Sequence, residues 1–222
     1  MNEPSEAPVE LPPEMELSPT RRWPALLRSV VLPLAILAII VGGLWYWDSR
    51  GGSDRPDDQY GTVDLPAEKN PTGEEPKAEE GRAAPDFLLE TAEGDTLRLS
   101  DLQGQPVIVN FWATWCPPCQ REMRELVAAY GTYKGQGLVI VGVDLQEPAD
   151  IVQNFADDFG VTFPLVIDRD GELSDVWRLG GPIQGIPTSY FIDKDGVIRA
   201  FFYGPMTEDA IAERLDEIGV TG

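Results

Sequence analysis

The sequence contains no histidine, and it has only two cysteines, Cys116 and Cys119. Without histidine, the chain lacks the commonest metal ligand and the commonest general base of proteins. A tetrahedral zinc site of the usual Cys/His type needs four such ligands, and the chain has only its two cysteines. A c-type haem site needs a histidine directly after Cys-x-x-Cys, where this chain has Gln120. These absences argue against a metal or haem site. We expect no cofactor, and the reactive group is the cysteine pair itself, a redox-active disulfide between Cys116 and Cys119.

Basic residues are scarce as well. The chain has 17 Lys and Arg against 38 Asp and Glu, which gives a net charge of −21. Nucleic-acid binding needs clustered lysines and arginines to contact the phosphates. The composition thus excludes nucleic acid as a partner.

One long uncharged apolar stretch occurs in the chain, at residues 29–47. It is just long enough to cross a bilayer, which takes about 20 apolar residues. Trp23 precedes it and Trp45 and Trp47 end it, as is typical of aromatic belts at the membrane surface. Three arginines before it favour a cytoplasmic N-terminus. We predict a cytoplasmic tail at 1–28 and a single-pass transmembrane anchor at 29–47; a buried soluble helix or a cleaved signal peptide are the alternatives.

Residues 48–82 are rich in Asp, Glu, Gly and Pro and show neither helical nor strand periodicity. Such a segment buries too little apolar surface to offset the entropy of ordering it. We predict a disordered acidic linker here, extended by repulsion among its charges. The folded domain is then expected at 83–222.

Strand-like and helix-like segments alternate from residue 83 onward, which predicts an α/β fold. Two strands around the turn 93–95 form a hairpin, and the apolar runs 107–111 and 138–143 suit strands buried on both faces. The other expected elements are helices at 117–133, 149–159 and 173–179, strands at 163–167, 189–192 and 197–202, and a last helix capped by Thr207.

The two cysteines are separated by two residues and lie between a strand-like run and a helix-like run. A dithiol at such a junction is suited to thiol–disulfide exchange. The helix dipole and free backbone N–H groups favour a thiolate at the helix start, so Cys116 is the predicted nucleophile. Cys119 lies one turn further, where it can attack the mixed disulfide and release the substrate.

Two prolines, Pro117 and Pro118, separate the cysteines. If Cys116 is the N-cap, its sulfur should accept hydrogen bonds from the second or third helical N–H. Pro118 has no N–H, so only the Cys119 N–H remains in the first turn. Since a stabilised thiolate raises the reduction potential, we expect a reducing rather than a strongly oxidising centre.

Other candidate residues lie near the dithiol. Glu122 follows Cys119 by three residues and can share its helix face; in a chain without histidine it is the natural proton acceptor for the resolving thiol, unless it is an ordinary exposed carboxylate. Trp115, Pro117 and Pro118 are the candidates for substrate contact, with Trp115 preferred over Trp112. Pro187, taken alone, is only a proline at a strand start.

Four segments together resemble the TlpA/ResA-like thiol–disulfide oxidoreductases, membrane-anchored relatives of thioredoxin within the redoxin/AhpC-TSA group. They are Ala-Pro-Asp-Phe at 84–87, Leu-Ser-Asp-Leu-Gln-Gly at 99–104, Val-Asn-Phe-Trp-Ala-Thr-Trp-Cys-Pro-Pro-Cys at 109–119, and Gly-Ile-Pro-Thr-Ser-Tyr-Phe-Ile-Asp at 185–193. The resemblance covers 83–222 in family order. It implies a thioredoxin fold with an N-terminal β-hairpin extension and a central insertion at about 144–182.

The resemblance also implies roles for particular residues. Pro187 is expected to be cis and to pack beside the dithiol, with Ile186 contacting the substrate backbone. Glu122 occupies the position of an active-site glutamate in the ResA-like branch. The implied activity is reduction of disulfides in extracytoplasmic protein substrates, often apocytochrome c before haem attachment. The electrons are expected from a transmembrane thiol carrier.

Three alternatives remain open at this point. One is a disulfide oxidant or isomerase, against which the two prolines argue. Another is a thiol peroxidase, but Val109 and Ala113 stand where the Pro-x-x-x-Thr-x-x-Cys frame would require Pro and Thr before Cys116. The last is a tethered binding domain with a structural disulfide, although a two-residue gap closes too short a loop to add much stability.

Overall fold

The computed structural model describes residues 60–179 and 185–221, together with Leu34, Leu37, Ala38, Ile40 and Gly42. The chain divides into two units, 1–54 and 55–222, and each is considered by itself. The five described positions of the first unit are helical. Among the residues described, no helix combines the length and the apolarity that a membrane crossing requires. The predicted tail at 1–28 lies outside the described residues and the predicted anchor at 29–47 largely so, and both stay predictions.

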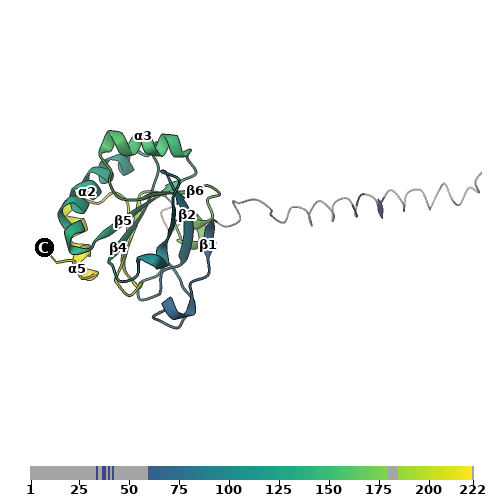
Figure 1. Cartoon of the computed structure of the whole chain (residues 1–222), viewed down its shortest axis with the longest axis horizontal. Helices are drawn as coiled ribbons and strands as arrows, with labels where there is room; N and C mark the ends of the chain where they lie inside the picture. The colour runs from purple at the N-terminus through teal and green to yellow at the C-terminus, as the bar shows by residue number, and fades with distance from the viewer. Residues whose placement is uncertain are drawn as a thin grey trace, which may run out of the picture. The chain divides into compact units, whose positions relative to one another are not determined.

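Within 60–179 and 185–221, eight strands form one mixed sheet (Figure 1). The strand order is β1-β2-β6-β5-β4-β7-β8, and β3 pairs with β2. Strands β4, β5 and β6 are parallel to one another, whereas β2 and β7 run antiparallel to their neighbours in this set. The strands are β1 (Gly61–Val63), β2 (Asp86–Thr91), β3 (Thr96–Arg98), β4 (Val107–Trp112), β5 (Val139–Leu145), β6 (Leu165–Asp168), β7 (Thr188–Ile192) and β8 (Ile198–Tyr203).

Strand β4 lies in the middle of the sheet and is buried along its whole length. Its continuous apolar run reflects this position, because both faces of a central strand are covered. Ile108 and Trp112 point into one hydrophobic cluster, while Val109 and Phe111 point into the other. The strand that precedes the dithiol is therefore held rigidly from both sides.

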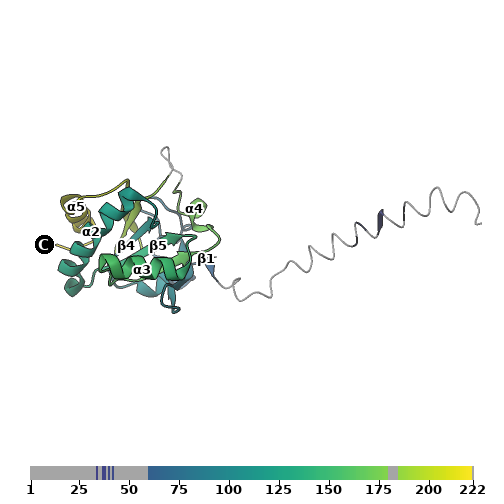
Figure 2. The ribbon, with the colours of Figure 1, turned by 90° about the horizontal axis from the view of Figure 1, so that it is seen from above.

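The helices cover the two faces of the sheet unequally. Apolar side chains of α2 (Pro117–Tyr133), α3 (Ala149–Phe159) and α5 (Glu208–Glu217) join the cluster on one face. The short α4 (Leu173–Val176) packs in the cluster on the other face. Helices α2 and α5 lie side by side in both ribbon views (Figures 1 and 2). Three helices therefore cover the face that also buries the two cysteines.

The helix bounds can be compared with those expected from the sequence. The bounds of α2 and α3 are confirmed. The last helix, α5, starts directly after Thr207, whose side chain caps it by accepting a hydrogen bond from the Ala210 N–H, as predicted. Helix α4 ends at Val176, so it is shorter than the expected 173–179. The chain leaves the helical conformation there, and Arg178 takes a positive φ of 52°. A left-handed residue of this kind breaks the helical repeat.

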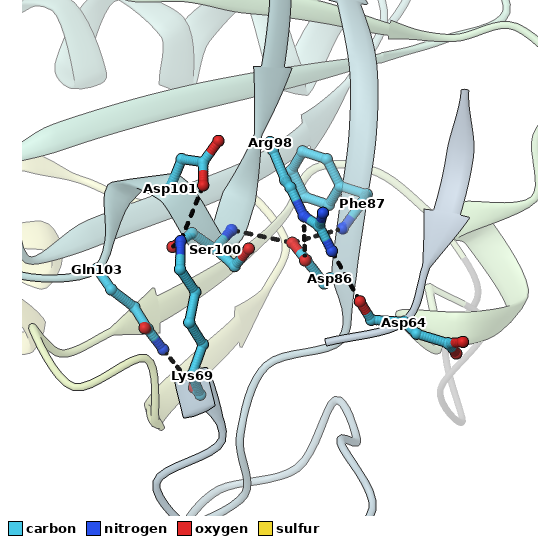
Figure 3. Close-up of polar contacts among 8 residues, drawn as sticks. All are labelled: Asp64, Lys69, Asp86, Phe87, Arg98, Ser100, Asp101 and Gln103. Carbon is cyan, nitrogen blue, oxygen red and sulfur yellow. Dashed lines mark hydrogen bonds and ion pairs between the residues drawn. The ribbon is translucent and has the colours of Figure 1, made fainter. Parts of the chain in front are cut away.

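The segment 60–82 corrects the predicted linker, because the structure makes it part of the folded unit. Strand β1 pairs antiparallel with β2, with Gly61 opposite Leu88. Further along, Lys69 donates hydrogen bonds to the Ser100 carbonyl at 2.7 Å and to the Asp101 carboxylate at 2.8 Å (Figure 3). Backbone pairing and ion pairs with the domain order this segment, so its low apolar content was a poor guide. Residues 48–59 lie outside the described residues, and there the linker stays a prediction.

A buried carboxylate anchors the same region (Figure 3). Asp86 is 2% exposed, and its Oδ2 accepts a hydrogen bond from Arg98 Nε at 2.7 Å. Arg98 also donates to the Asp64 carbonyl at 2.7 Å, next to the end of β1. Arg98 therefore joins the two strands of the hairpin β2–β3 through its ion pair and links the hairpin to the preceding segment through its bond to Asp64.

Candidate active site

The dithiol lies where the central strand β4 leads into α2. Cys116 is the N-cap of α2, and its Sγ accepts a hydrogen bond from the Cys119 N–H at 3.2 Å. Pro117 and Pro118 occupy the first two helical positions and have no N–H. The Cys119 N–H is therefore the first-turn donor, as predicted. The two cysteines form a disulfide and are 3% and 1% exposed. A disulfide at this place can be opened by exchange at the end of the helix that favours a thiolate.

Exposed residues surround the entrance to the disulfide. Trp115 is 66% exposed, directly before Cys116, while Pro117 is exposed and Pro118 half-buried directly after it. Trp112, the weaker candidate for substrate contact, is fully buried and packs on Phe155 with ring centroids 4.7 Å apart. The structure therefore leaves Trp115 as the aromatic side chain beside the dithiol that a substrate can reach.

The Ile186–Pro187 peptide bond is cis, as the resemblance implied. Strand β7 begins directly after it and pairs with β4, with Thr188 opposite Phe111. This pairing brings the carbonyl oxygen of Ile186 to 3.8 Å from Cys116 Sγ. Residues far apart in the sequence thus meet at the dithiol, with Pro187 buried and Ile186 half-buried.

Glu122 is buried, at 1% exposure, so the alternative of an ordinary exposed carboxylate is wrong. Its Oε2 accepts a hydrogen bond from Asn110 Nδ2 at 3.1 Å, and its Oε1 accepts one from the Met206 N–H at 3.3 Å. Burial raises the pKa of Glu122 to about 7, although these hydrogen bonds act in the opposite direction. A carboxyl group with a pKa near 7 can accept and return a proton at neutral pH.

The residues that hold Glu122 were not predicted from the sequence. Asn110 also donates to Ser189 Oγ at 2.8 Å, and these two residues face each other on β4 and β7. A signal was present, because Asn110 is the one polar residue in the apolar run of β4. Buried polar side chains need hydrogen-bond partners, so an isolated one in a central strand points to a polar neighbour.

The closed loop between the two cysteines is too short for the disulfide to contribute much stability. Its sulfurs instead lie at a helix start, beside a cis proline and one helical turn from a carboxyl group that titrates near neutrality. Such a pair is suited to being formed and broken repeatedly by exchange. These features define a thiol–disulfide oxidoreductase of the thioredoxin fold.

Comparison with known proteins agrees with this class. The AhpC/TSA family matches residues 81–201, more than half of the 222-residue chain. Thiol-disulfide oxidoreductase ResA of Geobacillus kaustophilus (strain HTA426) is 42% identical over 138 residues, which cover 62% of this chain and 77% of the relative. ResA of Bacillus subtilis (strain 168) is 37% identical over 139 residues, covering 63% and 75%. The chain belongs to the AhpC/TSA family and, within it, with the ResA thiol–disulfide oxidoreductases.

Solved structures show the same fold. StoA from Bacillus subtilis has a TM-score of 0.50 and 31% identity, and the match covers 58% of this chain and 95% of that one. A putative thiol:disulfide interchange protein DsbE from Chlorobium tepidum has a TM-score of 0.57 and 28% identity, covering 64% and 99%. The thioredoxin-like α/β fold expected from the sequence is confirmed.

Proposed function

We propose that this protein is a membrane-tethered reductase of protein disulfides that acts outside the cytoplasm, with apocytochrome c as the candidate substrate. The N-cap geometry of Cys116 is the observation that supports reduction, rather than oxidation, of the substrate. Its sulfur has one donor in the first turn, the Cys119 N–H at 3.2 Å, because both preceding helical positions are prolines. With so few donors the thiolate is only modestly stabilised, which keeps the reduction potential low.

The proposed reaction consists of two thiol–disulfide exchange steps between the dithiol and the substrate disulfide. The Cys116 thiolate attacks one sulfur of the substrate disulfide, and the other substrate sulfur leaves as a thiolate that takes up a proton. Cys119 then loses its proton to Glu122 and attacks Cys116 Sγ, which releases the second substrate thiolate. Two electrons pass to the substrate, and the Cys116–Cys119 disulfide remains, to be reduced again by a transmembrane thiol donor.

Changing the prolines tests the proposed direction. Pro118→Ala restores an N–H at the second helical position, where it can reach the cap, and Pro117→Ala restores one at the first, where it cannot. We expect Pro118→Ala to lower the pKa of the Cys116 thiol by about one unit and to raise the potential by about 30 mV. Pro117→Ala is the matched control and should change both quantities much less.

The potential is measured by equilibration with glutathione, and the thiol pKa by thiolate absorbance. The wild-type protein should lie nearer to the potential of thioredoxin, about −270 mV, than to that of the oxidant DsbA, about −120 mV. A value near the DsbA potential would refute the reducing direction and favour the oxidant alternative. Consumption of peroxide at a rate comparable to disulfide reduction would instead favour a peroxidase.

The substrate and the tether need separate experiments. Cys119→Ser should leave mixed disulfides on Cys116, and apocytochrome c should be among the trapped proteins, whereas the Cys116→Ser, Cys119→Ser double variant should trap none. Membrane fractionation of the full chain and of a chain lacking 29–47 tests the anchor. The full chain is expected in the membrane fraction and the truncated one in the soluble fraction; equal distribution would refute the tether.

A further inference from the structure

The carboxylate of Glu147 binds the loop that carries Cys116. Glu147 lies between β5 and α3, and its Oε2 accepts a hydrogen bond from the Thr114 N–H at 2.5 Å. Its Oε1 accepts one from the Thr114 hydroxyl at 2.6 Å. The Thr114 carbonyl accepts a third bond, from Gln120 Nε2 at 2.7 Å. Every polar group of Thr114, two residues before Cys116, is therefore bound.

The backbone on either side of the Glu147 amide has a specific conformation that orients this residue. Gln146, the residue before it, has a φ of 67°, a left-handed conformation that residues other than glycine adopt only infrequently. The Glu147 N–H donates to Asp144 Oδ1 at 2.9 Å, at the end of β5. Two backbone features outside the dithiol thus fix the position of one carboxylate.

Asp144, which accepts the hydrogen bond from the Glu147 N–H, is itself fully buried. Burial raises the pKa of Asp144 to about 8, and its interaction with the Glu147 side chain adds to the shift. Asp144 therefore holds its proton more tightly than an aspartate in water does. The two carboxylate oxygens of Glu147 have several lone pairs, so they can accept from both Thr114 donors at once.

We propose that Glu147 is a positioning residue for thiol–disulfide exchange, acting through Thr114 to fix the loop that sets the direction of Cys116. The inference depends on the class of reaction and is independent of the proposed direction, substrate and location. Exchange needs the attacking sulfur in line with the disulfide that it opens, and small misplacements of reacting groups are costly in rate. Charge-assisted hydrogen bonds to one residue are strong enough to hold such a loop.

Three substitutions separate positioning from charge. In Glu147→Gln the amide oxygen can still accept from the Thr114 N–H, while the amide nitrogen donates to the Thr114 hydroxyl. Glu147→Ala loses both contacts. Asp150→Ala removes an exposed acidic residue at the start of α3 and is the matched control.

The assay follows attack of the reduced full chain on a small aromatic disulfide over a range of pH. This separates the pKa of the Cys116 thiol from the limiting rate of its thiolate. We expect Glu147→Ala to lower the limiting rate about tenfold or more, the glutamine variant to restore most of it, and the control to match wild type. A small disulfide needs no protein partner, so this result does not depend on the proposed substrate.

Two results would overturn the proposal. One is an unchanged limiting rate in a folded Glu147→Ala protein. The other is an equal loss in Glu147→Gln, which would assign the effect to charge. If Glu147→Ala does not fold, Thr114→Ser and Thr114→Val take its place: serine keeps both donors and valine loses the hydroxyl, so a valine variant as fast as the serine variant would also overturn it.

Discussion

Folding moves the Glu122 carboxyl group out of water, so Glu122→Gln should make stability less dependent on pH. The side chain is 1% exposed, and burial raises its pKa from 4.5 to about 7. The folded state therefore holds this proton more tightly than the unfolded state does. The contribution of Glu122 to stability is most favourable below the unfolded pKa and is lost as pH rises from 4.5 through about 7.

The size of the effect follows from the shift. One pKa unit corresponds to about 1.4 kcal/mol, so full ionisation of Glu122 costs roughly 3 kcal/mol of folding free energy. Between about pH 5 and about pH 8 the part that is lost is roughly 2.5 kcal/mol. Glutamine does not titrate, so the stability of the variant relative to wild type should rise by about that amount over this range.

Urea unfolding of both proteins, with the disulfide intact, measures the difference at the two pH values. The glutamine amide faces Asn110 Nδ2, a donor, so the variant carries a pH-independent penalty from rearranged hydrogen bonds. The difference in stability between variant and wild type is taken at each pH, and the two differences are then compared. This comparison cancels the pH-independent penalty, and it also cancels the titration of Asp144, which both proteins share. A stability difference that is the same at both pH values would refute the argument from burial.

Two further stability predictions follow from buried carboxyl groups. Asp144→Asn should become progressively more stable than wild type as pH rises from about 4 to about 8, because burial raises the pKa of Asp144; a thermal midpoint difference that stays flat would contradict this. Arg98→Ala should cost about 2 kcal/mol in urea unfolding, less than a fully buried pair, since two backbone N–H groups still bind Asp86. Lys69→Ala, whose partner Asp101 is exposed, is the control and should cost under about 1 kcal/mol.

Local sequence signals were enough for much of the domain. Helix α2 starts at Pro117 and α3 at Ala149, as predicted, because proline marks the start of each and apolar residues recur at helical spacing. The hairpin β2–β3 follows from the Glu-Gly-Asp turn between two short strands. Strand β5 extends two residues further than predicted, to Leu145, because Asp144 pairs with Trp112 on β4. A buried aspartate inside a strand contradicts the usual polarity pattern, so periodicity ends the strand too early.

Contacts between distant segments were not predictable in the same way. The segment 60–82 is ordered by contacts such as that of Lys69 with Ser100, 31 residues away, and composition carries no trace of them. The positions of the cysteines and of Glu122 on α2 follow from their spacing. The burial of Glu122 does not, because it depends on the Met206 N–H, 84 residues away. Likewise the Thr114–Glu147 contact joins residues 33 apart.

Because the chain has no histidine, a carboxyl group, that of Glu122, accepts the proton in the proposed reaction. When Cys119 passes its proton to Glu122, a negative charge moves from the carboxylate to the sulfur, and the net charge of the buried site does not change. A base with a fixed low pKa would be a poor acceptor, whereas burial raises the pKa of Glu122 to about 7, closer to that of a thiol. The burial that destabilises the charged carboxylate in the folded protein is therefore what suits Glu122 to receive the proton of Cys119.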